Sequence, residues 1–197
     1  GSFILPPVHD QRGQVITHPF IKTPLPPSSP RRPAAAGFSI DNLVSSGEVR
    51  SVAYLAEFFG KTRSCAPTIT PDNDIISRVD VSFISLGGPS SNFKTEDALA
   101  HPANNLVTMS NMGFVHPASQ QPVVSITPNA QYDYGMILRI CPTQHPKRTW
   151  VVCAGLGEWG TSGASWFLAN KWSKLFWYIL WRRQKNYAAL VRVRRGQ

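Results

Sequence analysis

The chain of 197 residues is 42% hydrophobic, contains 17 prolines and carries a formal net charge of +9. Its length suits one domain of about 150 residues with an appendage. Cys65, Cys141 and Cys153 are too few and too widely spaced for a disulfide framework or a C-x-x-C metal site, so a reducing, cytoplasmic setting is expected. The five histidines show no metal-ligand spacing, and we expect no metal site.

An extended arm is expected at the start of the chain. Eight of the prolines lie between Pro6 and Pro33, and proline fixes φ and removes a backbone hydrogen-bond donor. We therefore predict a Pro-rich extended arm over residues 1–38, either disordered or laid against the domain that follows at residues 39–197.

The first predicted helix covers residues 48–59. Apolar residues recur on one face of this segment, as expected of a helix that packs on a sheet. They are Val49, Val52, Leu55, Ala56 and Phe59. Gly60 follows as a typical C-cap residue and is expected to end the helix.

Two predicted strands end in glycine-rich loops. Residues 79–86 read as a strand and run into the loop G-G-P-S-S-N, which a short helical segment follows at residues 94–99. Residues 150–154 form a second apolar run that stops at a group of glycines, before a helix expected at residues 162–177. The two segments therefore share the order strand, glycine loop, helix.

The remaining segments complete the predicted sheet. Residues 101–132 predict irregular strands or a hairpin, and residues 134–140 predict a strand that a short turn connects to the strand at 150–154, so these two are expected to be antiparallel neighbours. Residues 186–193 predict a last strand, which closes a right-handed, parallel βαβ unit. The predicted fold class is α/β, a Rossmann-like mixed, mostly parallel sheet with helices on both faces.

The second loop has the spacing of a phosphate-binding motif. Gly155, Gly157 and Gly160 follow the pattern G-x-G-x-x-G between a strand and a helix, where backbone amides can point at an anion. A dinucleotide dehydrogenase also needs an acidic residue some 20 positions later to hold the ribose. No acidic residue follows Glu158, which excludes that class.

Both glycine loops would face one ligand if their strands are parallel, because ligands of open α/β sheets bind beyond the carboxyl ends of the strands. The alternative is that they are tight turns that bind nothing. The predicted ligand-binding residues are Gly87, Gly88, Ser90, Ser91, Asn92, Gly155, Gly157, Gly160, Thr161 and Ser162.

The loop G-L-G-E-W-G-T at residues 155–161 resembles that of the lysine-decarboxylase-like nucleoside phosphoribohydrolases and the related SLOG nucleotide-sensor superfamily. The segment S-L-G-G-P at residues 85–89 is similar to the first glycine loop of that group. This resemblance implies a Rossmann-like fold that senses a nucleotide or hydrolyses the N-glycosidic bond of NAD or a nucleotide, possible roles being those of a bacterial effector or regulatory module. No further cofactor is implied. The family's glutamate, three residues after the threonine, falls at Ala164 here.

Glu158 is the acidic residue left in the second loop. As a catalytic residue it would orient a ribose or act as a general base. Alternatively it is a loop charge at a helix N-terminus, where a negative charge is favourable. Asp80, Asp97 and Asp133 are expected to be turn or cap residues.

The charge of the C-terminal part supports a second function class. Residues after Glu158 include no acid, and tryptophans accompany the positive charges, so this segment could serve a non-enzymatic module that binds nucleic acid or protein. For Trp166 and Trp172 the alternative is core packing against the sheet. Residues 175–181 are apolar but too short to span a membrane. Oligomers are compatible with either class. The positive residues are Lys171, Lys174, Arg182, Arg183, Lys185, Arg192, Arg194 and Arg195.

Overall fold

The structure, a computed structural model, describes residues 3–5, 23–24, 38–40, 45–63, 67–110, 113–125, 131–175 and 185–196. The chain divides into two compact units, residues 1–44 and residues 45–197. In the first unit, β1 (Phe3–Leu5), β2 (Thr23–Pro24) and β3 (Phe38–Ile40) form an antiparallel sheet with the order β1-β3-β2. The rest of the predicted Pro-rich arm lies outside the described residues, as do Cys65, Arg182 and Arg183.

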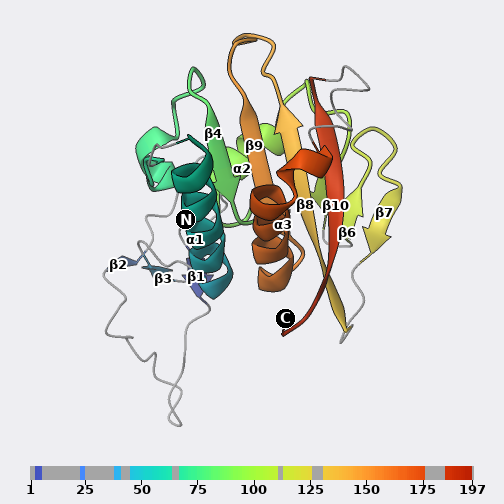
Figure 1. The fold of residues 1–197 in the computed structure, drawn as a ribbon. Helices are drawn as coiled ribbons and strands as arrows, with labels where there is room; N and C mark the ends of the chain where they lie inside the picture. Colours follow the sequence, from blue (N-terminus) through green and yellow to red (C-terminus); the bar gives the residue numbers. More distant parts are fainter. Residues whose placement is uncertain are drawn as a thin grey trace. The chain divides into compact units, whose positions relative to one another are not determined.

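A four-stranded sheet organises the second unit (Figure 1). Its order is β10-β8-β9-β4, formed by β4 (Phe83–Leu86), β8 (Tyr132–Ile140), β9 (Trp150–Gly155) and β10 (Tyr187–Arg194). Strands β8 and β9 are antiparallel neighbours, as the short turn between them predicts. Strands β4 and β9 are parallel, and β10 is antiparallel to β8.

The prediction of a mostly parallel, Rossmann-like sheet is wrong. Only one of the three pairings in the four-stranded sheet is parallel, because β8 lies between β9 and β10 and runs opposite to both. A second sheet, of β5 (Thr108–Ser110), β6 (Gly113–Val115) and β7 (Pro122–Ser125), is antiparallel throughout. The irregular strands expected before residue 132 are confirmed and form this second sheet. The described part of the second unit is therefore a mixed α/β arrangement with two sheets.

Apolar residues bury both faces of the central strands. Met136 and Leu138 of β8 pack with α2 (Phe93–Ala100) and the second sheet, whereas Ile137 and Cys153 pack with the opposite helices. Side chains alternate between the two faces of a strand, so Ile137 belongs to one core and its sequence neighbours Met136 and Leu138 belong to the other. Helices α1 (Ser46–Arg63) and α3 (Glu158–Asn170) cover one face, and α2 covers the other (Figure 1).

Helix α1 begins at a capping box and ends later than predicted. Ser45 Oγ accepts a hydrogen bond from Glu48 N at 3.1 Å, and Glu48 Oε2 accepts one from Ser45 N at 2.9 Å. The prediction that Gly60 ends the helix is wrong, since α1 continues to Arg63. Among the described residues, leaving aside its chain neighbours and the backbone of α1 itself, no atom lies within 4 Å of the place where a Cβ on Gly60 would stand, so the glycine sits on an open side of the helix.

Two buried groups of the α3 side have raised pKa values. Burial raises the pKa of Cys153 to about 12, and this thiol is a core residue as predicted. Burial also raises the pKa of Tyr187 to about 12. Neither group has the character of a reactive nucleophile.

Candidate functional site

The two glycine loops leave the sheet at the same edge. Strands β4 and β9 are parallel, Leu86 pairs with Cys153, and Gly87 N donates a hydrogen bond to the Cys153 carbonyl at 3.1 Å. Helix α2 follows the first loop and α3 follows the second, so both helix N-termini lie at the carboxyl ends of β4 and β9. We call this place the loop edge. The question is whether the amides of these N-termini are available to a ligand.

The protein itself uses the amides at the start of α2. Asn92 is the N-cap: its Oδ1 accepts hydrogen bonds from Lys94 N at 2.9 Å and Thr95 N at 3.1 Å. Phe93 N donates to the buried Asp72 Oδ2 at 2.7 Å. Asn92 Nδ2 in turn donates to the Leu86 carbonyl at 3.1 Å. The structure therefore gives Asn92 a capping role, and both the oxygen and the nitrogen of its side chain are hydrogen-bonded to the backbone.

The first loop is a tight turn. The Gly88 carbonyl accepts hydrogen bonds from the backbone N–H groups of Ser91 and Asn92, and from Ser91 Oγ at 3.2 Å. Gly87 has φ +96°, a conformation that favours glycine, and a Cβ there would collide with the carboxylate of Glu48. Ser90 is exposed and Ser91 is buried. The positive φ explains the glycine at position 87 without a ligand, since the Glu48 carboxylate ends a flexible side chain that could move.

The glycines of the second loop bring α3 onto the sheet backbone. A Cβ on Gly155 would collide with Thr161 N, and one on Gly160 would collide with the Tyr134 carbonyl of β8. A Cβ on Gly135, the partner of Gly155 in the β8–β9 register, would collide with the Gly160 carbonyl. The G-x-G-x-x-G spacing therefore serves close packing of a helix on two strands.

Asp133 lies where a phosphate at α3 would bind. This residue of β8 is 4% exposed, and its Oδ2 accepts a hydrogen bond from Gly160 N at 2.7 Å. A Cβ on Gly157 would stand 2.8 Å from the same oxygen. The prediction of a turn role for Asp133 is wrong, because Asp133 lies within β8, and the N-cap of α3 is Gly157. The Asp133 carboxylate instead binds the N–H of Gly160, 27 positions further along the chain. A carboxylate of the chain itself thus occupies the N-terminus of α3.

Glu158 joins α3 to α1. Its Oε2 accepts a hydrogen bond from Ser46 Oγ at 2.6 Å and lies 3.9 Å from the Arg50 guanidinium. The backbone supports the same contact, because a Cβ on Gly47 would stand 2.6 Å from the Glu158 carbonyl. These bonds give the proposed catalytic carboxylate a structural role between two helix N-termini.

The side chains of Thr161 and Ser162 are buried in the first turns of α3. Ser162 Oγ donates to the Trp159 carbonyl at 3.3 Å, and the Thr161 carbonyl accepts from Ser165 Oγ at 3.0 Å. The structure thus brings the predicted site residues to one edge, but the contacts that it shows for them are internal.

The loop edge is electrostatically unfavourable for an anion. Glu48, Asp133 and Glu158 place three carboxylates beside the loops. At an effective dielectric constant of about 20, a phosphate charge about 4 Å from one carboxylate is repelled by about 4 kcal/mol. A helix N-terminus attracts it by only about 0.3–1 kcal/mol. Arg50 offsets one of the three negative charges, because its guanidinium lies 3.9 Å from Glu158, and repulsion by the other two carboxylates is the larger effect.

No family model, curated protein or solved structure matches this chain.

Trp166 of α3 points away from the core. The interpretation of Trp166 as a core residue is wrong: its side chain is 42% exposed. Trp172, by contrast, packs against the core. The two tryptophans differ in position: Trp166 belongs to α3, whose buried face holds Gly160, Ala164 and neighbouring serines, whereas Trp172 lies beyond the end of α3. Lys171 Nζ lies 5.7 Å from the centre of the Trp166 ring.

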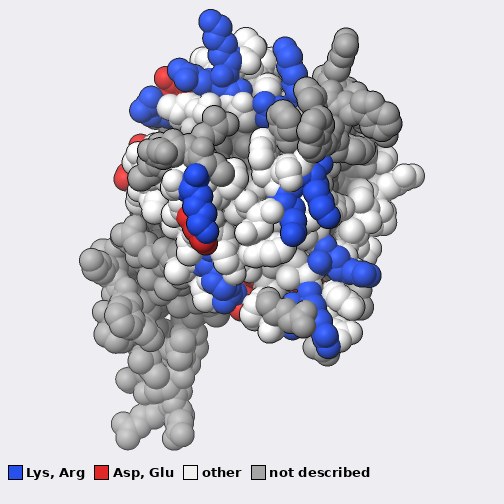
Figure 2. Space-filling model, viewed as in Figure 1, with Lys and Arg blue, Asp and Glu red and all other residues white. Residues whose placement is uncertain are grey.

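The positive residues that we call the basic segment are exposed or half-buried. None of them forms an ion pair within the described part of the chain. Figure 2 shows Lys and Arg side chains over the side of the unit that carries α1 and α3, with few acidic ones between them. The basic segment consists of Lys171, Lys174, Lys185, Arg192, Arg194 and Arg195.

A second aromatic side chain, Tyr132 of the inner strand β8, lies beside Arg192 of the edge strand β10. The Arg192 guanidinium lies 4.8 Å from the centre of the Tyr132 ring, and Tyr132 is 36% exposed. Arg192 and Arg194 belong to β10, which has no strand partner on its outer side among the described residues. Charged side chains on an edge strand also discourage pairing with other chains.

Sequence reasoning missed three contributors to the loop edge. Ser46 and Arg50 of α1 contact Glu158, and Glu48 of the same helix lies against Gly87. The sequence signal for Glu48 is the pattern S-S-G-E, whose Ser45 and Glu48 form the capping box. No local signal connects these residues with a loop more than 100 positions away, as the Ser46–Glu158 bond does.

In the described residues, no helix has both the length and the apolar character needed to cross a membrane.

Proposed function

We propose that the chain is a non-enzymatic module that binds nucleic acid through the basic segment. One observation carries this proposal: six positive side chains between Lys171 and Arg195 are accessible, and in the described parts of the chain no carboxylate neutralises them. The sequence has no acidic residue after Glu158 that could do so. Unpaired positive charge attracts the phosphate backbone independently of base sequence.

The charge sets the salt dependence that the proposal requires. Each phosphate contact contributes about −0.7 to −0.9 to the slope of log K against log salt. Six contacts would give a slope of about −4 to −5, which is an upper limit because the lysines that follow α3 and the basic residues on and beside β10 would have to bind the same ligand. A slope steeper than about −2 is expected if half of them do.

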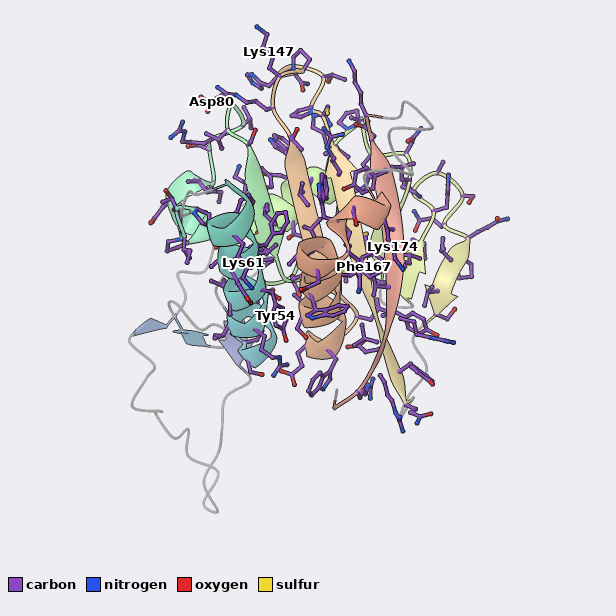
Figure 3. All side chains as sticks on the ribbon, in the orientation of Figure 1. Tyr54, Lys61, Asp80, Lys147, Phe167 and Lys174 are labelled. Carbon is purple, nitrogen blue, oxygen red and sulfur yellow. The ribbon has the colours of Figure 1, made fainter. Side chains whose placement is uncertain are left out.

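Fluorescence anisotropy with a labelled oligonucleotide at several salt concentrations tests the proposal. Lys171→Ala with Lys174→Ala should flatten the slope by about 1.4–1.8. The matched control is Lys147→Ala with Arg148→Ala, which removes two exposed charges from the turn between β8 and β9. Figure 3 shows Lys147 at that turn, away from Lys174. Absent binding, or a loss that is equal for both double variants, would contradict the proposal.

A nucleotide ligand at the loop edge is the second candidate, and the common edge of the two loops favours it. The three carboxylates oppose it. A thermal-shift screen with NAD and ADP-ribose tests this candidate. Asp133→Asn is a better variant for it than a change at Gly157, because a side chain at position 157 would displace the Asp133 carboxylate.

A reducing, cytoplasmic setting belongs to the same proposal. Cys141 and Cys153 are free thiols, which supports it.

A further inference from the structure

Trp166 and two lysines form a small aromatic and basic surface at the end of α3. The indole is 42% exposed, Lys171 Nζ lies 5.7 Å from its centre, and Lys174 follows one turn later with an exposed side chain. Lys174 N donates to the Lys171 carbonyl at 2.9 Å, so the backbone still turns between these two lysines.

This combination fits a ligand with both a flat ring and a negative charge. An exposed indole offers a π face on which a nucleic-acid base can stack, whatever the base. Lysines beside it attract the phosphates that flank the stacked base. Core packing does not account for the exposed position, since the buried side of α3 consists of small residues and Leu168.

We infer that the ligand is single-stranded nucleic acid, with a base stacked on Trp166 and adjacent phosphates at Lys171 and Lys174. This inference rests on the proposed function. It adds a preference for single strands over duplexes. The bases of a duplex are already stacked on each other, so along the helix they offer no face to an indole. The chemistry thus favours single strands over duplexes, whereas charge alone does not.

Anisotropy titrations with a labelled single strand and with a labelled duplex of the same sequence, at equal ionic strength, test the inference. Trp166→Ala should weaken single-strand binding about 5- to 150-fold, the range that base stacking on an aromatic residue provides, and leave duplex binding and the salt slope unchanged. Trp166→Phe should retain most of the affinity. Val49→Ala, at an apolar residue of α1 that is 57% exposed, is the control and should change neither.

The outcomes separate the inference from the function on which it rests. If single strand and duplex bind equally and Trp166→Ala has no effect, the inference is overturned and the proposed function stands. If neither binds, both fail. If vesicles containing phosphatidylserine bind and oligonucleotides do not, the basic segment serves a membrane surface and both are overturned. Circular dichroism and the melting temperature confirm that each variant is folded.

Discussion

Removing the carboxylate of Asp133 should destabilise the protein substantially. Asp133 Oδ2 accepts the bond from the buried Gly160 N at 2.7 Å, and the side chain is 4% exposed. In Asp133→Ala a buried N–H loses a charged acceptor, at a cost of about 1.5–3 kcal/mol. The favourable interaction with the N-terminus of α3 adds about 0.3–1 kcal/mol. We therefore expect the free energy of unfolding to fall by about 2–4 kcal/mol.

Urea denaturation measures this loss, and Asp133→Asn is the matched variant. The amide of Asn keeps an acceptor for Gly160 N but has no charge, so its cost should be about 1 kcal/mol. Asp80→Ala is the control, because Asp80 is exposed and contacts only Arg78 among its described neighbours. An Asp133→Ala protein within about 0.5 kcal/mol of the parent would refute the reasoning, since surface changes usually lie in that range. It would also reopen the N-terminus of α3 as a ligand site.

Gly160→Ala should destabilise by about 1–3 kcal/mol, because its Cβ would collide with the β8 backbone, whereas Gly60→Ala should stabilise by about 0.5–1 kcal/mol; equal effects in denaturant would contradict this. Lys94→Met should cost about 3–5 kcal/mol, because the lysine is 2% exposed and its Nζ donates to two carbonyls and a carboxylate; a neutral result would show that the ion pair is dispensable. Cys153 and Tyr187 keep their protons in the folded state up to a pKa of about 12, whereas unfolded groups ionise near 9 and 10. The free energy of unfolding should therefore be insensitive to them below pH 9 and fall as pH rises toward about 12, with a smaller fall in Cys153→Ala.

Local patterns predicted several elements of the fold correctly. The short turn before Trp150 predicted the antiparallel pairing of β8 and β9, and the strand predicted at residues 186–193 is β10, which spans Tyr187–Arg194. The order of the strands in the sheet, by contrast, could not be predicted from local patterns. The chain continues from β9 through α3 to β10, and nothing in that stretch indicates that β8 lies between the two strands.

The glycine loops show a different limit of sequence reasoning. A glycine that admits a phosphate and a glycine that admits another backbone look identical in sequence, since both simply lack Cβ. At Gly155 and Gly160 the neighbour is the backbone of α3 and β8. Gly135 pairs with Gly155 between β8 and β9, and two paired glycines indicate close packing of a helix. The pairing itself could not be read from the sequence.

The error at Trp166 has a pattern that could have been recognised. Helix α3 contains G-T-S-G-A-S, and residues that small allow a helix to lie close to a sheet. A large side chain such as Trp166 must then lie on the other side of the helix. The periodicity of the apolar residues did not indicate the outward position of Trp166, because α3 is apolar on more than one face.

Chemical-shift mapping by NMR tests the central claim most directly. Titration of labelled protein with a single-stranded oligonucleotide should shift the amides of residues 166–174 and 187–195 and leave those of residues 87–92 and 155–162 unchanged. ATP at the same phosphate concentration should not bind at the loop edge. Shifts concentrated at residues 87–92 and 155–162 with either ligand would contradict the account and support a nucleotide site between the two glycine loops.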